Sequence, residues 1–347
     1  MRVAPLAVCV LHLIARRVSC FSASVPRRAA FYTDPDLERR GRDALLLPGA
    51  LEDVLTEGSC KIMPVYKGKS CLVVEEGKAS IYTMAVTLAR ELLEADSSGA
   101  TATLIHLGAK GGHRYFGLHV PPHMPFPAPP GAQLLELRSA AEMLLDDADS
   151  GLLGLARALA AFHGATGFCP ACGTATASYK LGSGRRCTAA ECGAVQYPRI
   201  DPAVMMMVLS TDGSHALLGR KKAWAPGRYS CLAGFTEMSE SLEQTVVREV
   251  EEEAGVAVDP ASVIFVSSQP WPFPRQLMVG FFARALPAEG GALPTLYVDP
   301  KELEAAQWFP KGEVAAALSS DGSDGGLHFP GKASLARRLL QDWALGT

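Results

Sequence analysis

Residues 234–256 read GFTEMSESLEQTVVREVEEEAGV, and this stretch says more about the fold than any other part of the chain. Five residues separate Gly234 from Glu240, and seven more separate Glu240 from Arg248, which begins the run REVEEEAGV. Every position fits the pattern G-x5-E-x7-R-E-U-x-E-E-x-G-U, in which U is apolar. The pattern fixes the spacing of several glutamates.

The ends and the apolar stripe of this stretch predict a helix. Ser241 with Gln244 three residues later is typical of an N-cap with a capping box, and Gly255 is typical of a helix end. At about 100° per residue the apolar side chains share one arc. They are Leu242, Val246, Val247, Val250 and Ala254.

Three glutamates adjoin that arc: Glu249, Glu252 and Glu253, whereas Glu251 points away and Glu240 precedes the helix. A glutamate cluster on a helix is usually a solvated face. Here the carboxylates crowd beside a buried stripe, and like charges repel unless a hard cation joins them. We therefore expect Mg²⁺ or Mn²⁺, which could bind a diphosphate and lower the pKa of an attacking water.

Composition describes an ordinary globular protein. The 347 residues are 48% hydrophobic and 20% charged, enough for about two domains or two and a small module. The net charge of −3 gives no general attraction to nucleic acid or to an anionic membrane. We expect no DNA partner, and an RNA substrate would need a specific site.

Residues 1–30 differ from the rest, because they contain arginines and serines and the first acid is Asp34. This composition is typical of a transit peptide for a mitochondrion or chloroplast. The apolar run at 3–15 also suits a secretory signal or a bipartite plastid signal, and a disordered or buried N-terminus is a third interpretation. The run is too short to span a bilayer, so we expect no membrane partner.

Four of the nine cysteines form a pattern. The pairs Cys169-x2-Cys172 and Cys187-x4-Cys192 are separated by 14 residues, which matches a four-cysteine zinc ribbon. A redox or disulfide pair is the alternative, but no thioredoxin-type context surrounds them. Four thiolates leave no open coordination position, so we expect structural Zn²⁺, one per chain.

Periodicity and turn signals predict an α/β chain. We expect a targeting segment (1–30), an α+β N-terminal domain (31–165), the zinc ribbon (166–199) and an α/β/α sandwich with a mixed sheet (200–345). Expected strands are 101–107, 115–120, 203–209, 216–221, 229–233, 263–267, 277–285 and 304–309, and expected helices are 82–94, 134–162 and 334–345, with a flexible insertion at 319–326.

A further motif, SQPWPFP at 268–274, lies 12 residues beyond the box. Its prolines make a stiff extended segment that cannot pair as an inner strand, and physics alone favours core packing for Trp271 and Phe273. Together with the box and the cysteine pairs, this motif resembles the NADH pyrophosphatase branch of the Nudix superfamily. The resemblance covers residues 166–343 and is looser at 31–40 and 115–117.

The resemblance implies hydrolysis of NADH to NMNH and AMP, usually by a homodimer. It implies that divalent metal is held by the carbonyl of Ala233 and by Glu249, Glu253 and Glu302, the last in the segment DPKEL. Glu240, Arg248 and Glu252 would complete the catalytic cluster. Tyr197 (from the partner subunit) and Phe235 would stack on a substrate ring. The rest of the pocket would be Gln269, Pro270, Trp271, Pro272, Phe273, Pro274, Arg275, Gln276 and Ala336.

Two departures leave the substrate open among NADH, NADPH, NAD⁺ and an NAD-capped RNA. Gln276 stands where many relatives have Ser, and Gly182 replaces an acidic substrate contact of bacterial members. The alternatives are a Nudix hydrolase of other nucleoside diphosphate derivatives such as ADP-ribose, an enzyme that removes NAD caps from RNA, and a non-catalytic zinc-ribbon binding module. The intact acidic cluster argues against the last.

Overall fold

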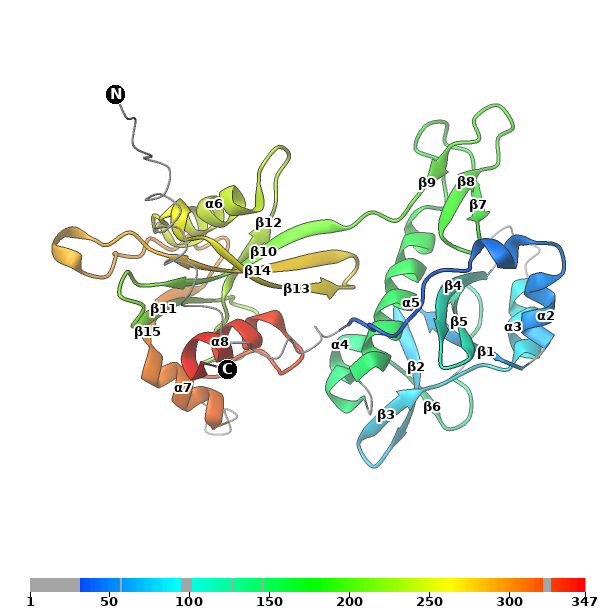
Figure 1. Ribbon diagram of the computed structural model, residues 1–347, viewed down its shortest axis with the longest axis horizontal. Coiled ribbons are helices and arrows are strands. Elements are labelled where there is room, and N and C mark those ends of the chain that lie inside the picture. The colour runs from blue at the N-terminus through cyan, green and yellow to red at the C-terminus, as the bar shows by residue number, and fades with distance from the viewer. Residues whose placement is uncertain are drawn as a thin grey trace, which may run out of the picture.

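The computed structural model describes residues 32–56, 58–94, 102–126, 128–144, 147–320 and 326–346. The predicted targeting segment and residues 321–325 of the predicted insertion lie outside these ranges. Two layered α/β domains lie side by side, and a small sheet stands at one end of the N-terminal domain (Figure 1). Within the described ranges, no helix has both the length and the apolar character needed to cross a membrane.

The N-terminal domain is built on a mixed sheet in the order β3-β2-β1-β5-β4, with β6 paired to β2. Its β1 and β5 pair in parallel, whereas the other neighbours are antiparallel. The strands are β1 (Cys60–Tyr66), β2 (Lys69–Glu75), β3 (Lys78–Ile81), β4 (Thr103–Lys110), β5 (His113–Val120) and β6 (Ala132–Leu135).

Both faces of this sheet are covered by helices. Met63 and Val65 of β1 lie in one core cluster with α5, whereas Ile62 lies in another core cluster with residues of α2 and α3. This is the alternation that a strand buried on both faces requires. The helices are η1 (Asp43–Leu46), α2 (Ala50–Thr56), α3 (Val86–Glu94), α4 (Leu137–Ala140), η2 (Ala141–Met143) and α5 (Asp147–Ala165).

The ribbon is a small sheet of β7 (Thr176–Tyr179), β8 (Gly184–Cys187) and β9 (Val195–Gln196). Its β7–β8 turn packs on the N-terminal sheet, where the N–H of His106 donates to the carbonyl of Leu181 at 2.9 Å. At Gly182, φ is +78° and a Cβ would lie 2.9 Å from Ile105 Cα. Glycine at this departure from the bacterial pattern therefore permits close packing.

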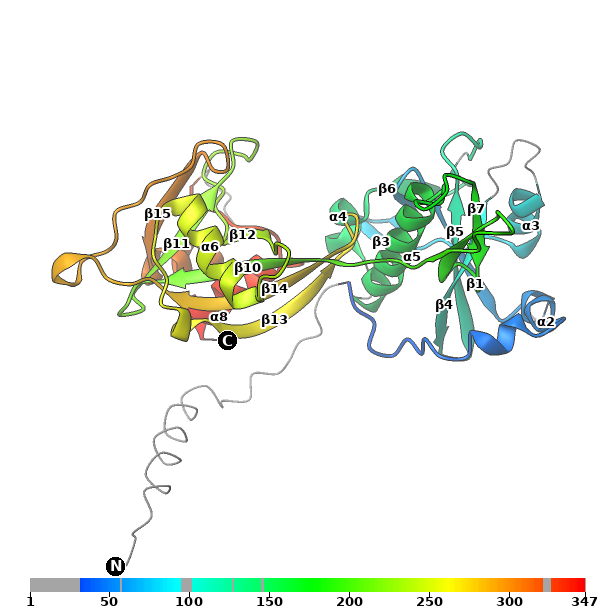
Figure 2. The same ribbon diagram turned by 90° about the horizontal axis from the view of Figure 1, so that it is seen from above.

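The C-terminal domain is an α/β/α sandwich, as predicted, on the sheet β13-β14-β10-β11-β15 with β12 paired to β10. Val204, Met206 and Val208 of β10 lie in the core cluster with α6, whereas Met207 and Leu209 lie in the cluster with α7 and α8. Figure 2 shows α6 and α8 on opposite faces. The strands are β10 (Asp201–Leu209), β11 (His215–Arg220), β12 (Leu232–Phe235), β13 (Ile264–Trp271), β14 (Gln276–Arg284) and β15 (Ala305–Pro310). The helices are α6 (Leu242–Ala254), η3 (Pro260–Ser262), η4 (Glu289–Gly291), α7 (Lys311–Ser319) and α8 (Leu335–Leu345).

Several predicted elements were wrong in extent. The single helical stretch at 134–162 is broken, because Leu134 and Leu135 pair with β2 and the backbone of Glu136 is extended. Helix α3 begins at Val86 rather than at Tyr82, and α7 was not predicted. The strand predicted at 229–233, which leads into the box, lies later, at Leu232–Phe235. β13 runs on through Pro270 to Trp271, which an edge strand tolerates.

Candidate active site

The box forms β12, a loop and α6. The capping box is confirmed: the N–H of Ser241 donates to Gln244 Oε1 at 2.9 Å and the N–H of Gln244 donates to Ser241 Oγ at 3.2 Å. Gly255 ends the helix at φ 65°. These local bonds fix where the helix starts and stops, and so fix the angular positions of its acids.

Arg248 joins the acidic side chains to one another. It binds Glu240 through Nε at 2.6 Å and Nη2 at 2.8 Å, and its Nη1 contacts Glu249 at 2.9 Å and Glu252 at 2.8 Å. Its Nη2 also donates to the carbonyl of Phe235 at 2.9 Å. The hydrogen bonds from Arg248 lower the pKa of Glu240 to about 2. One guanidinium thus holds three carboxylates and the loop before the helix.

Glu253 is the most buried of these acids, with 3% of its surface exposed. Burial, with a smaller effect from the charges of Glu249 and Glu302, raises its pKa to about 8, although Lys221 opposes the rise. Within the described residues, its Oε2 atom has no hydrogen-bond partner. A buried carboxylate oxygen without a donor is costly, which fits a site that takes a cation.

Gly234 makes room for Glu249. A Cβ at this position would lie 1.8 Å from Glu249 Cδ and 2.0 and 2.1 Å from the two carboxylate oxygens. The carboxylate therefore lies directly against the β12 backbone, one residue beyond Ala233. Burial raises the pKa of Glu249, and Arg248 opposes the rise.

Glu302 reaches the cluster on a turn that is tied to the end of α6. The N–H of Asp299 donates to the carbonyl of Glu253 at 3.3 Å, and the N–H of Glu302 donates to the carbonyl of Asp299 at 3.1 Å. The side chain of Asp299 accepts from the N–H of Lys301 at 2.8 Å. Glu253 and Glu302, 49 residues apart in the sequence, therefore meet here, although their carboxylates do not converge as the cysteine thiols do.

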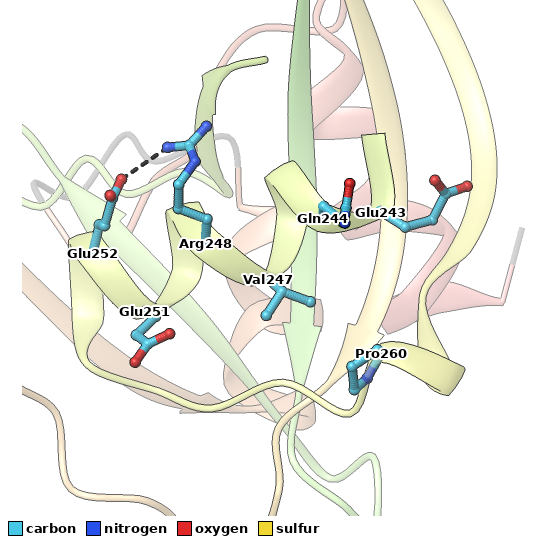
Figure 3. Close-up of a pocket in the computed structure, with 7 residues that line it drawn as sticks. All are labelled: Glu243, Gln244, Val247, Arg248, Glu251, Glu252 and Pro260. Atoms are coloured by element: carbon cyan, nitrogen blue, oxygen red, sulfur yellow. Dashed lines mark hydrogen bonds and ion pairs between the residues drawn. The ribbon is translucent and has the colours of Figure 1, made fainter. Parts of the chain in front are cut away.

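The outer side of α6 borders a groove of about 650 Å³. Figure 3 shows Glu252 directed toward Arg248 and Glu251 directed away from it, as predicted from the helical period. The groove is lined by Glu243, Gln244, Val247, Arg248, Glu251, Glu252 and Pro260. Arg248 and Glu252 thus connect this groove to the acidic cluster.

The four cysteines of the ribbon come together. One ligand atom from each lies within 4.8 Å of all the others, with Cys169 and Cys192 sulfurs 3.8 Å apart and Cys172 and Cys187 sulfurs 3.4 Å apart. Hydrogen bonds from Thr174 lower the pKa of Cys172 to about 6, toward the thiolate that binds metal. The cluster fits a tetrahedral metal site.

The predicted substrate residues fall into two groups. Tyr197 and Phe235 are 61% and 53% exposed and so are open to a ligand. Gln269 and Ala336 are buried, and the carboxamide of Gln269 contacts the backbone of Ala333 and Leu335 at the start of α8. Their side chains do not line an open pocket, because they pack inside the sandwich.

The remaining pocket residues lie at the end of β13, in the turn at 272–275 and at the start of β14. Arg275 Nε binds Asp201 at 2.9 Å, and Gln276 pairs with Trp271 across the sheet. Trp271 and Phe273 pack against the core cluster of the N-terminal domain. The structure thus agrees with the packing interpretation that physics alone favours. The N-terminal contacts of these rings were missed, because no local pattern in the sequence signals a contact with Tyr32.

Comparison with known proteins agrees with this architecture. Residues 199–325 match the family model described as the NUDIX domain, and residues 60–161 match the model described as the NADH pyrophosphatase-like rudimentary NUDIX domain. The chain belongs to the NADH pyrophosphatase branch of the Nudix superfamily. The N-terminal sandwich is thus the rudimentary Nudix domain of this branch.

Relatives within the Nudix superfamily match only part of their length. The human NAD-capped RNA hydrolase NUDT12 is 38% identical over 62% of this chain and 44% of its own. The Mycobacterium bovis NAD-capped RNA hydrolase NudC is 38% identical over 61% of this chain and 66% of its own. Nudix hydrolase 19, chloroplastic, of Arabidopsis thaliana is 42% identical over 48% of this chain and 38% of its own. This chain spans less than half the length of the human relative.

Proposed function

We propose that this chain hydrolyses the diphosphate bond of NADH, or of a related NAD-type dinucleotide, with Mg²⁺ or Mn²⁺ as catalytic cofactor. The observation that carries the proposal is buried Glu253, whose Oε2 atom has no partner in the described chain, beside Glu249 and Glu302. Two relatives named as NAD-capped RNA hydrolases support a substrate that contains an NAD group.

The residues of the cluster take different roles in this proposal. Glu249, Glu253, Glu302 and the carbonyl of Ala233 are the candidate metal ligands. When bound, a divalent cation would neutralise charge on the diphosphate and lower the pKa of the attacking water. Arg248 holds the carboxylates of Glu240, Glu249 and Glu252 in place before substrate binds, which reduces the cost of ordering them.

A second candidate substrate is NAD-capped RNA, and one observation favours it. Lys221, Lys222 and Lys301 line a cavity of about 520 Å³ together with Glu302 and with Glu304, which is paired to Arg220. Within the described residues, none of the three ammonium groups has a carboxylate at ion-pair distance. Local positive charge of this kind attracts phosphate even where the net charge of the chain is −3.

A substrate panel tests the proposal: NADH, NADPH, NAD⁺, ADP-ribose and NAD-capped RNA, with wild type and Glu253→Gln. The substitution should lower kcat by roughly 10²-fold or more, because it removes a group that stabilises charge in the transition state. Glu251→Gln on the same helix is the matched control and should keep wild-type kcat. Near wild-type turnover by Glu253→Gln at saturating Mg²⁺ would rule out the metal-site assignment.

Three further features belong to the proposal: structural zinc, a homodimer and organelle targeting. Structural zinc in the ribbon is supported by the cysteine cluster, and a homodimer is supported by the exposed apolar side chains of Tyr197, Ile200 and Phe235. Organelle targeting rests on the composition of residues 1–30 and on the chloroplastic relative. Deletion of these residues should leave activity in vitro unchanged and move a tagged protein to the cytosol, whereas loss of activity would oppose this role.

A further inference from the structure

The segment 269–276 leaves its own domain and reaches the N-terminal domain beside α4 and α5 (Figures 1 and 2). Three of its residues are prolines, which donate no backbone hydrogen bond. β13 pairs with β14 as far as the residue pair Trp271 and Gln276. The other edge of β13 has no neighbouring strand in the described sheet. The shape of the segment at the turn must therefore depend on side chains from outside the sheet.

Two aromatic rings of the segment meet Tyr32 of the N-terminal domain. The ring centroids of Tyr32 and Trp271 are 5.9 Å apart, those of Tyr32 and Phe273 5.5 Å, and those of Trp271 and Phe273 5.1 Å. All three pairs are edge-to-face, the geometry that aromatic quadrupoles favour. The three rings form one unit that spans the two domains.

Arg157 of α5 holds the backbone of the same segment. Its Nη1 donates to the carbonyl of Pro272, its Nε donates to the carbonyl of Gly68 at 3.1 Å, and its guanidinium lies 4.6 Å from the centroid of Phe273. The planar group thus binds two carbonyls in different domains and stacks on a ring. Gly154, one turn earlier on α5, lies close to the same segment, because a Cβ there would be in van der Waals contact with Pro272 Cγ at 3.4 Å.

The other end of the segment is fixed within the Nudix domain. Gln269 Nε2 donates to the carbonyl of Ala333 at 2.8 Å, and its Oε1 accepts from the N–H of Leu335 at 2.8 Å. Both ends of the segment, which the family resemblance assigns to the substrate pocket, are thus held, one by α8 of the Nudix domain and one by α5 of a domain without the acidic box.

We propose that Arg157 and Tyr32 are positioning residues: the N-terminal domain sets the conformation of segment 269–276, and through it the affinity for the dinucleotide. This inference rests on the proposed function. It assigns the N-terminal domain to substrate binding, while the metal cluster on α6 carries the chemistry. Loss of the contact should therefore raise KM and leave kcat nearly unchanged.

The test compares Arg157→Met, Arg157→Lys and Tyr32→Leu with Arg90→Met. Arg90 is the control because it lies on α3, on the other face of the N-terminal sheet, and pairs with Glu52. Hydrogen exchange of the amides of Trp271, Phe273, Arg275 and Gln276 reports the segment independently of activity. We expect about ten-fold faster exchange and about ten-fold higher KM for NADH in Arg157→Met, with kcat within about two-fold.

Arg157→Lys keeps the charge but loses the planar fork, so its KM should lie between wild type and Arg157→Met. Unchanged exchange in Arg157→Met would overturn the contact, and faster exchange with unchanged KM would overturn the positioning role. Tyr32→Leu must show the same pattern, which keeps the test valid if Arg157→Met misfolds. If wild type does not hydrolyse NADH, the proposed function fails, while the exchange measurement still decides whether Arg157 holds the segment.

Discussion

Gly234 shows how one residue without a side chain controls the acidic cluster. Because a Cβ would lie 1.8 Å from Glu249 Cδ, Gly234→Ala should displace that carboxylate. We expect kcat to fall by roughly 10²-fold with the fold retained, as for loss of a group that stabilises transition-state charge. Gly312→Ala is the control, since a Cβ there meets no atom within 4 Å. Wild-type kcat in Gly234→Ala would contradict the placement of Glu249.

Two buried histidines, His106 and His163, and the partly buried His119 predict a pH effect on stability. Burial lowers the pKa of His106, His119 and His163 to about 4 each. An unfolded histidine titrates near 6.5, so the unfolded chain binds more protons between these values. Stability is therefore complete above about pH 6.5 and falls as pH decreases toward about 4, by up to about 1.4 kcal/mol per pH unit for each ring.

His106 offers the direct measurement, because neither ring nitrogen has a hydrogen-bond partner within the described residues. Replacing it with Phe removes one titrating group and an unsatisfied polar ring, beside Phe116. The drop in thermal midpoint between pH 7.5 and 5.0 should be smaller in His106→Phe than in wild type. Exposed His113→Gln is the control, and equal drops in His106→Phe and wild type would contradict the prediction.

The ribbon, as an element, should depend on its metal. Exchange of Cys172 for Ser removes one of four sulfurs that lie within 4.8 Å of one another. We expect loss of zinc and a lower thermal midpoint, since metal binding and folding of such modules are coupled. Elemental analysis measures the zinc, and Cys60→Ser, outside the cluster, should keep it. Wild-type protein without zinc would contradict this assignment.

The linker that follows β9 carries Tyr197, which is exposed enough to stack on a base. Stacking is worth about 1–3 kcal/mol per base in nucleic-acid systems, so Tyr197→Ala should lower kcat/KM by roughly ten-fold to a hundred-fold. The loss should be equal for NADH and NADPH. A minimal diphosphate without a base is the control substrate; an equal loss with it would make Tyr197 structural.

Local signals explain which elements could be predicted. The ends of α6 follow from Ser241, Gln244 and Gly255, which act on their own neighbours, and the prediction of this helix was confirmed. The helix at 134–162 was wrong, because pairing of Leu134 with β2 overrides a local preference. The surroundings of Phe273 depend on Arg157, more than 100 residues away, and no local pattern reports such a contact.

The charged residues of the site also show that local sequence patterns do not predict contacts between distant side chains. The helical period separated Glu251 from Glu249, Glu252 and Glu253, and it predicted a buried face correctly. It could not show that Arg248 binds Glu240 across the loop, because that contact requires the loop to fold back on the helix. The helical period predicts the direction in which each side chain leaves α6. It does not predict which residues a long side chain such as that of Arg248 contacts, because those contacts form only in the folded chain.

The assembled molecule exposes apolar groups where its two domains are joined. Tyr197 and Ile200 lie in the link between ribbon and Nudix sheet, and both are exposed. If a second copy covers them, Ile200→Glu should convert a dimer to a monomer, because a charge would be buried at the contact. Light scattering after size-exclusion chromatography measures the mass. A wild-type monomer, or a dimeric variant, would contradict a dimer through this link.

The rudimentary Nudix domain repeats the layered sandwich of the catalytic domain, yet the box pattern occurs once in the sequence. On the proposed function, selection would act on the two halves in different ways. In the C-terminal half a lost glutamate would end the reaction, so few lineages could inherit the change. In the other half, on the proposed positioning role, inheritance would require only a folded sheet with Tyr32 and Arg157 in place, so most other exchanges would spread by drift. The similarity of this domain to a Nudix domain should therefore be lost from its sequence long before it is lost from its fold.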